Sequence, residues 1–166
     1  VTTAVDLEWG YTLPKSRDER DRKSLINYGT SACYYDARFL AKNNLNDYYE
    51  GKTIEKEHLQ KAHHELASKK ELAKILLFVE QELDAGAIGI GLPLDYVSKG
   101  VNDVELEALF RLAARRDVPL FTHIRMSDNP VDPSGFQEVI DLAEKTGASV
   151  HMAHIVSTGL QRVPLY

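Results

Sequence analysis

The chain has 166 residues, of which 43% are hydrophobic and 27% charged, and its formal net charge is -5. This composition is typical of a globular domain with a sizeable core, and it excludes a disordered chain. The acidic balance argues against a nucleic-acid partner or an anionic membrane surface, and no apolar run approaches the ~18 residues of a membrane span.

The first strand is expected near residues 2–8, where β-branched residues dominate, and it ends on Glu8 shortly before Gly10. A carboxylate at the carboxyl end of a strand lies where site residues lie in a parallel sheet. Solvation of the strand end explains the same residue equally well. Because the chain opens directly on this strand and without a methionine, we expect further sequence upstream.

A second strand is expected near 26–32, after a charged run at 14–24 that we interpret as a solvated loop. Cys33 follows this strand. No basic partner is fixed near it by spacing, so we expect a packed thiol rather than a nucleophile. A single cysteine excludes an internal disulfide and suits a reducing compartment, which predicts a cytoplasmic protein.

One long helical region is expected over 54–85, followed by a buried strand near 87–94. The histidines of the helical region are expected at the surface, and they are His58, His63 and His64. They do not form an H-E-x-x-H motif. After the strand, the loop 95–100 carries Tyr96 and Lys99, which are candidate substrate contacts because the loop reaches the edge where parallel strands end.

The last third contains two strands, near 118–124 and 149–155, each ending close to a histidine. Between them, residues 133–147 have the apolar spacing of a helix that covers a sheet. Such a short crossover makes the strands parallel, so His123 and His154 are expected to be neighbours. Two imidazoles on adjacent strands suit a divalent metal, most simply zinc; two buried histidines bonded to the backbone are the alternative.

Five strands alternate with helices, which predicts an α/β fold with a parallel sheet. A complete (β/α)8 TIM-type barrel needs ~250 residues, so we expect residues 1–166 to form a single incomplete barrel domain. A flavodoxin-type nucleotide-binding domain also fits the alternation, but the sequence has no phosphate-binding loop.

Four segments, in this order, resemble the amidohydrolase superfamily, and within it the D-aminoacylase (N-acyl-D-amino-acid deacylase) branch. They are VTTAVDLE at 1–8, AGAIGIGL at 85–92, FTHIR at 121–125 and HMAHI at 151–155. The resemblance implies a metal-dependent barrel of which this chain carries about strands two to six. It also implies that His123 and His154 are metal-binding histidines on the fifth and sixth strands.

The resemblance extends to other site residues. Glu8 stands beside the position where this branch carries a metal-ligating cysteine, so Glu8 is a candidate third ligand for one or two divalent ions, expected to be Zn2+. Tyr96 and Arg125 resemble residues that face the substrate. The superfamily's His-x-His pair has no counterpart here, and the general-base aspartate of its eighth strand is absent, so no catalytic residue is assigned.

The function implied for the complete protein is metal-dependent hydrolysis of a non-peptide amide bond in a small molecule, as in N-acyl-amino-acid deacylases. A cyclic amidase of the hydantoinase or dihydroorotase type is an alternative enzyme. The other alternative is a catalytically inactive barrel fragment that acts as an oligomerising or binding module. Because an open parallel edge is prone to pairing, the expected partners are the remainder of the barrel or a second copy of the chain.

Overall fold

The structure is a computed structural model that describes residues 2–12, 25–46, 55–97, 99–127, 129 and 132–155. The charged run at 14–24 therefore lies outside the described residues. The strands are β1 (Thr3–Asp6), β2 (Asn27–Thr30), β3 (Ala32–Cys33), β4 (Ile90–Pro93), β5 (Leu120–His123) and β6 (Val150–Met152).

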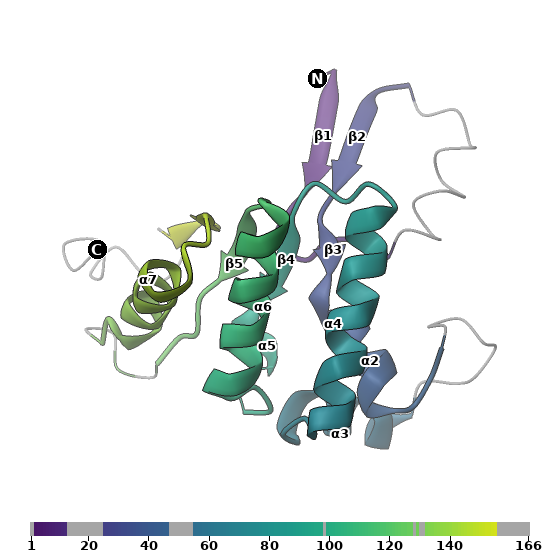
Figure 1. The fold of residues 1–166 in the computed structure, drawn as a ribbon, viewed down its shortest axis with the longest axis vertical. Coiled ribbons are helices and arrows are strands. Elements are labelled where there is room, and N and C mark those ends of the chain that lie inside the picture. Colours follow the sequence, from purple (N-terminus) through teal and green to yellow (C-terminus); the bar gives the residue numbers. More distant parts are fainter. Residues whose placement is uncertain are drawn as a thin grey trace.

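Every strand pair in the described part of the chain is parallel. β1 pairs with β2, and β3-β4-β5-β6 form a second sheet in chain order. Only Ser31 separates β2 from β3, and its amide donates to the carbonyl of Asp6 at 3.0 Å, so the two sheets follow one another. Figure 1 shows β1 and β2 extending beyond the other strands. The α/β class and the parallel pairing are confirmed, whereas closure into a barrel stays a prediction.

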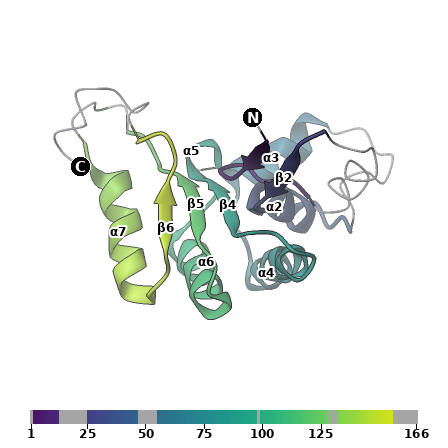
Figure 2. The same cartoon turned by 90° about the horizontal axis from the view of Figure 1, so that it is seen from above.

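The helices are α2 (Tyr34–Lys42), α3 (Lys56–His64), α4 (Lys69–Asp84), α5 (Leu94–Val97), α6 (Asp103–Arg116) and α7 (Ser134–Thr146). Three of them, α4, α6 and α7, lie side by side along one face of the sheet (Figure 2). The helices expected between the third and fourth strands and between the two histidine strands are confirmed as α6 and α7. A right-handed parallel crossover places covering helices in this way.

The helical region expected over 54–85 consists of two helices, α3 and α4, because the helix is interrupted between His64 and Lys69. Ser68 caps α4: its Oγ accepts from the Glu71 amide at 3.3 Å, and the Glu71 carboxylate accepts from the Ser68 amide at 2.7 Å. This reciprocal pair is a capping box, which starts a new helix. The helix α2 was not expected. Cys33 is its N-cap, and the Cys33 Sγ accepts a hydrogen bond from the Asp36 amide at 3.4 Å.

The core lies between the sheet and the three covering helices. The strands contribute fully buried side chains such as Ile90, Leu92 and Leu120. They meet an apolar stripe of α6 that includes Leu106 and Phe110, both of which have no exposed surface. Burying each such side chain stabilises the fold by about 1.5–3 kcal/mol. The carboxyl ends of the strands are thereby held rigidly, which is where the histidines lie.

A buried ion pair fastens α2 to the loops around it. The guanidinium of Arg38 donates to Glu105 and also to the carbonyl of Gly100 at 2.5 Å and that of Ala62 at 2.8 Å. Tyr34 donates its hydroxyl to Glu105 at 2.6 Å. Burial and the neighbouring Glu105 carboxylate hold the pKa of the Tyr34 phenol well above its usual value. The ion pair therefore fixes the end of α3 and the start of α6 against α2.

Within the described residues, no helix is both long enough and apolar enough to cross a membrane.

Candidate metal centre

Two of the three side chains of the candidate site lie at the ends of neighbouring parallel strands. His123 is the last residue of β5, opposite Pro93 of β4, and His154 lies two residues beyond the end of β6. Their rings have centroids 4.7 Å apart. The expected proximity of His123 and His154 is therefore present in the structure.

The third side chain arrives from the segment after β1. Ser31 Oγ donates to the carbonyl of Leu7 at 2.7 Å. A Cβ on Gly91 would lie 2.8 Å from the Leu7 carbonyl oxygen and 2.9 Å from that of Glu8, so glycine lets this backbone lie directly against β4. Gly10, with φ of 75°, then turns the chain away. These contacts place Glu8 at the histidine edge of the sheet.

The three side chains converge on one point. His123 Nδ1 lies 3.2 Å from Glu8 Oε1 and 3.3 Å from His154 Nε2, and His154 Nε2 contacts Glu8 Oε2. All three ligand atoms lie within 4.8 Å of one another. Two ligand atoms held ~2.05 Å from a tetrahedral zinc ion lie ~3.3 Å apart. The separations of His123 Nδ1 from Glu8 and from His154 are of this size, whereas His154 Nε2 and Glu8 Oε2 lie closer together.

Hydrogen bonds account for only part of this triangle of contacts. An imidazole nitrogen either donates a proton or accepts one, so a nitrogen that donates to Glu8 cannot also accept from the other histidine. At most two of the three contacts are hydrogen bonds at any time. A cation among them would engage all three lone pairs. One carboxylate and two imidazoles also match a catalytic zinc set with three protein ligands.

The site is anchored on one side and open on the other. The side chain of His123 is 10% exposed and that of Glu8 20%, whereas that of His154 is 44% exposed. His154 has φ of 30°, in the left-handed region that non-glycine residues rarely occupy. Backbone strain of this kind clusters at functional sites. The cluster is therefore more accessible to solvent at His154 than at His123 or Glu8.

Of the residues expected to contact the substrate, Tyr96 lies beside the cluster, and a role for the exposed Lys99 stays a prediction. Tyr96 sits on α5, it is 53% exposed, and its ring centroid is 5.5 Å from that of His123. Arg125 instead donates Nε to Glu138 Oε2 at 2.9 Å and Nη2 to the carbonyl of Val101 at 2.9 Å. A substrate role for Arg125 stays a prediction, since it requires this ion pair with α7 to open.

Two aromatic residues near the cluster were missed in the sequence. Trp9 directly follows Glu8, and its ring centroid lies 4.8 Å from that of Tyr35 and 5.3 Å from that of Tyr96. Tyr35 in turn places its hydroxyl 2.5 Å from His63 Nε2. His63 is therefore half-buried rather than a surface histidine, and this burial lowers its pKa. The adjacent tyrosines at the start of α2 were the available signal.

Cys33 is buried, as expected for a packed thiol, and burial raises its pKa well above its ordinary value. Its amide donates to Glu82 Oε2 at 2.8 Å. Burial, opposed by this hydrogen bond and reinforced by Asp36, raises the pKa of Glu82 to about 8. The thiol thus does not supply a thiolate ligand near neutral pH.

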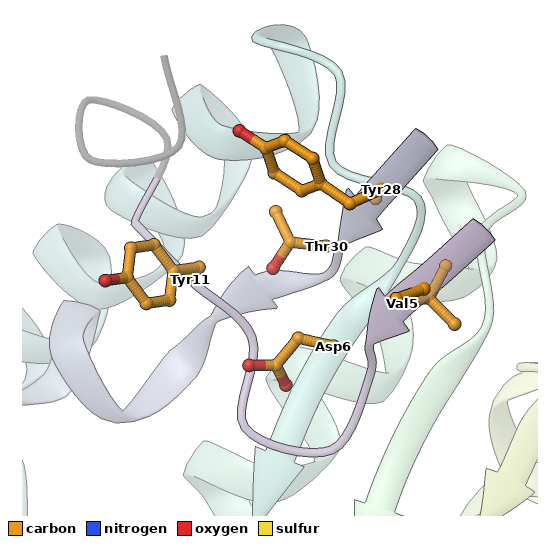
Figure 3. Close-up of a pocket in the computed structure, with 7 residues that line it drawn as sticks. Val5, Asp6, Tyr11, Tyr28 and Thr30 are labelled. Atoms are coloured by element: carbon orange, nitrogen blue, oxygen red, sulfur yellow. The ribbon is translucent and has the colours of Figure 1, made fainter. Parts of the chain in front are cut away.

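A separate hollow lies on the β1–β2 sheet (Figure 3). It encloses about 300 Å³, and its lining includes Asp6, Tyr11, Tyr28 and Thr30. None of the three clustered side chains contributes to it. We therefore assign the candidate chemistry to the strand ends and not to this hollow.

Neither a family model nor a curated protein matches the chain. A solved zinc-containing deacylase is similar in fold. It is the N-acyl-D-glutamate deacylase from Bordetella bronchiseptica, in complex with zinc and a phosphonate inhibitor that mimics the tetrahedral intermediate of the reaction. The two share 22% identity with a TM-score of 0.61, over 81% of this chain. This chain covers 24% of that deacylase, so the likeness establishes the fold and not the activity.

Proposed function

We propose that Glu8, His123 and His154 bind a divalent cation, most simply zinc, and that the protein is a metal-dependent hydrolase of non-peptide amide bonds, of the N-acyl-amino-acid deacylase type. The observation that carries the proposal is the convergence of three ligand atoms within 4.8 Å at the ends of parallel strands. Three different parts of the chain supply them, so folding itself assembles the site.

The ligand types favour zinc among the common divalent ions. Imidazole nitrogens suit zinc and its transition-metal neighbours, whereas magnesium and calcium prefer all-oxygen sites. His123 would bind through Nδ1 and His154 through Nε2, since these atoms face Glu8. Each ring then carries its proton on the other nitrogen. The fold likeness to a deacylase solved with zinc is consistent with this choice.

The residues around the cluster divide the remaining work. A zinc ion bound by these residues would supply Lewis-acid polarisation of an amide carbonyl and activation of water. His123 is the last residue of the buried strand β5 and would hold the ion against the sheet. The exposed side of His154 leaves room for substrate. Tyr96 stands beside His123 on that edge and can orient the group next to the scissile bond.

Zinc titration into chelator-treated protein by calorimetry tests the ligand set. We expect one ion per site in the wild type. Glu8→Gln and His154→Asn should each weaken binding by more than about tenfold, since loss of even an outer-sphere partner costs about 10–100-fold. His151→Asn is the matched control, because His151 is an exposed histidine of β6 outside the cluster. Equal losses in the control and the cluster variants would refute the assignment.

Hydrolysis tests the activity separately from binding. The zinc-loaded protein should release amine from N-acyl-amino acids, and Glu8→Gln should abolish the release. Turnover of hydantoins in place of N-acyl-amino acids would instead favour the cyclic amidase. Zinc binding without turnover of either class would favour the inactive binding module.

A further inference from the structure

Three aromatic rings pack together beside the candidate metal centre, and we call this cluster the aromatic shelf. It consists of Trp9, Tyr35 and Tyr96. Trp9 lies 4.8 Å from Tyr35 in a tilted arrangement and 5.3 Å from Tyr96 in an edge-on one, measured between ring centroids. Both are favourable aromatic geometries. The rings come from the segment after β1, from α2 and from α5, so the fold brings them together.

The shelf is built on a rigid support. Tyr35 is only 8% exposed, and its ring packs against that of Trp9 in a tilted arrangement. The Tyr35 hydroxyl forms a hydrogen bond with Nε2 of His63 on α3, at 2.5 Å, and this bond fixes the orientation of the Tyr35 ring. A half-buried histidine and a buried phenol thus hold Trp9 in place before any ligand arrives. Such preorganisation reduces the entropy lost on binding.

The other two rings of the shelf, Trp9 and Tyr96, are exposed to solvent next to the metal ligands. Trp9 is 37% exposed and Tyr96 is 53% exposed. Trp9 is bonded to Glu8 along the chain, and Tyr96 lies 5.5 Å from His123 between ring centroids. A substrate ring that contacts Trp9 and Tyr96 would therefore place the amide to which it is attached close to the candidate metal ligands. Aromatic side chains that remain exposed beside a site gain free energy when an apolar ligand covers them.

We infer that the aromatic shelf binds an aromatic or planar apolar ring of the amide substrate, next to the scissile bond. This inference rests on the proposed function, since it assigns the substrate class of the same site. Arg125, the other residue expected to face the substrate, is held by Glu138 at 2.9 Å, whereas Trp9 and Tyr96 are exposed. Edge and face contacts with tryptophan and tyrosine favour a π system over a saturated ring of similar shape.

The test compares two neutral amides, N-benzylacetamide and N-(cyclohexylmethyl)acetamide, which differ only in the aromaticity of the ring. Their affinities are measured by NMR titration in the chelator-treated protein and again with zinc. Trp9 is the only tryptophan of the chain, so its fluorescence reports the same binding. We expect the benzyl compound to bind about 2- to 12-fold more tightly, which corresponds to the ~0.5–1.5 kcal/mol of an aromatic pair.

The preference for the benzyl compound should become smaller in Tyr96→Leu, because one of the two exposed rings that contact the ligand is removed. Phe78→Leu is the control, since Phe78 is a half-buried aromatic residue of α4 and not part of the shelf, and it should keep the preference. Equal affinities of the two amides in the wild type, or the same preference in Tyr96→Leu, would overturn the inference. Because binding is first measured without metal, a failure of zinc binding overturns the proposed metal centre and is seen independently of the ring preference.

Discussion

Replacing Glu82 with glutamine should make the protein more stable at alkaline pH and remove part of the pH dependence of its unfolding. Glu82 lies on α4 and is 9% exposed, and it accepts a hydrogen bond from the Cys33 amide at 2.8 Å. The ionisable groups near Glu82 are the Asp36 carboxylate and the Cys33 thiol. Glutamine keeps an acceptor for the Cys33 amide but carries no charge.

The sign follows from the direction of the shift. Burial raises the pKa of the folded Glu82 carboxyl from 4.5 to about 8, so the folded protein retains a proton that the unfolded chain has lost. The stabilising contribution of this proton is complete below pH 4.5 and disappears as the pH rises through 8. Each pKa unit corresponds to ~1.4 kcal/mol, so the whole window amounts to about 5 kcal/mol.

Urea unfolding followed by circular dichroism, at half-unit steps from pH 5 to pH 8, measures this difference. The free energy of unfolding of the wild type should fall relative to Glu82→Gln by about 1.4 kcal/mol per pH unit over this range. Glu144→Gln makes the same chemical change at an exposed position of α7 and should show no such slope. A difference between wild type and Glu82→Gln that is constant with pH would show that the pKa of Glu82 is not raised in the folded protein.

Two further predictions concern the support of the site. Gly91→Ala should weaken zinc binding, measured by calorimetry, by more than about tenfold. The new Cβ would lie 2.9 Å from the Glu8 carbonyl oxygen and would displace Glu8 from the cluster. Gly29→Ala should leave zinc affinity unchanged, since the nearest atom to its Cβ is at 3.6 Å; equal effects would contradict the positioning of Glu8. Glu105→Gln should destabilise the fold by about 3–5 kcal/mol in urea unfolding, because it leaves the buried Arg38 charge without its partner, and a loss below about 1 kcal/mol would argue against a buried ion pair.

Local patterns in the sequence predicted most of the sheet. The apolar strands and the short crossover helix between them are enough to make β5 and β6 parallel, and this places His123 beside His154. Helix α6 was also predictable, because Asn102 is a favoured N-cap and accepts from the Glu105 amide at 3.0 Å. These features depend on contacts within about thirty residues of sequence.

The remaining features depend on contacts between distant parts of the chain. Glu8 and His154 are 146 residues apart, and their contact requires the close approach of the first segment to Gly91, which no local pattern announces. Helix α2 was missed because Tyr34 and Tyr35 read as a continuation of the strand, and cysteine is an uncommon N-cap. The aromatic shelf was missed because its three rings come from distant parts of the chain.

X-ray absorption at the zinc edge on the zinc-loaded protein detects the ligands around the ion. We expect two imidazole nitrogens and one carboxylate oxygen at ~2.0–2.2 Å. One imidazole contribution should vanish in His154→Asn and persist in His151→Asn. A spectrum without imidazole scattering, or one that changes with His151 and not with His154, would contradict a metal centre formed by Glu8, His123 and His154.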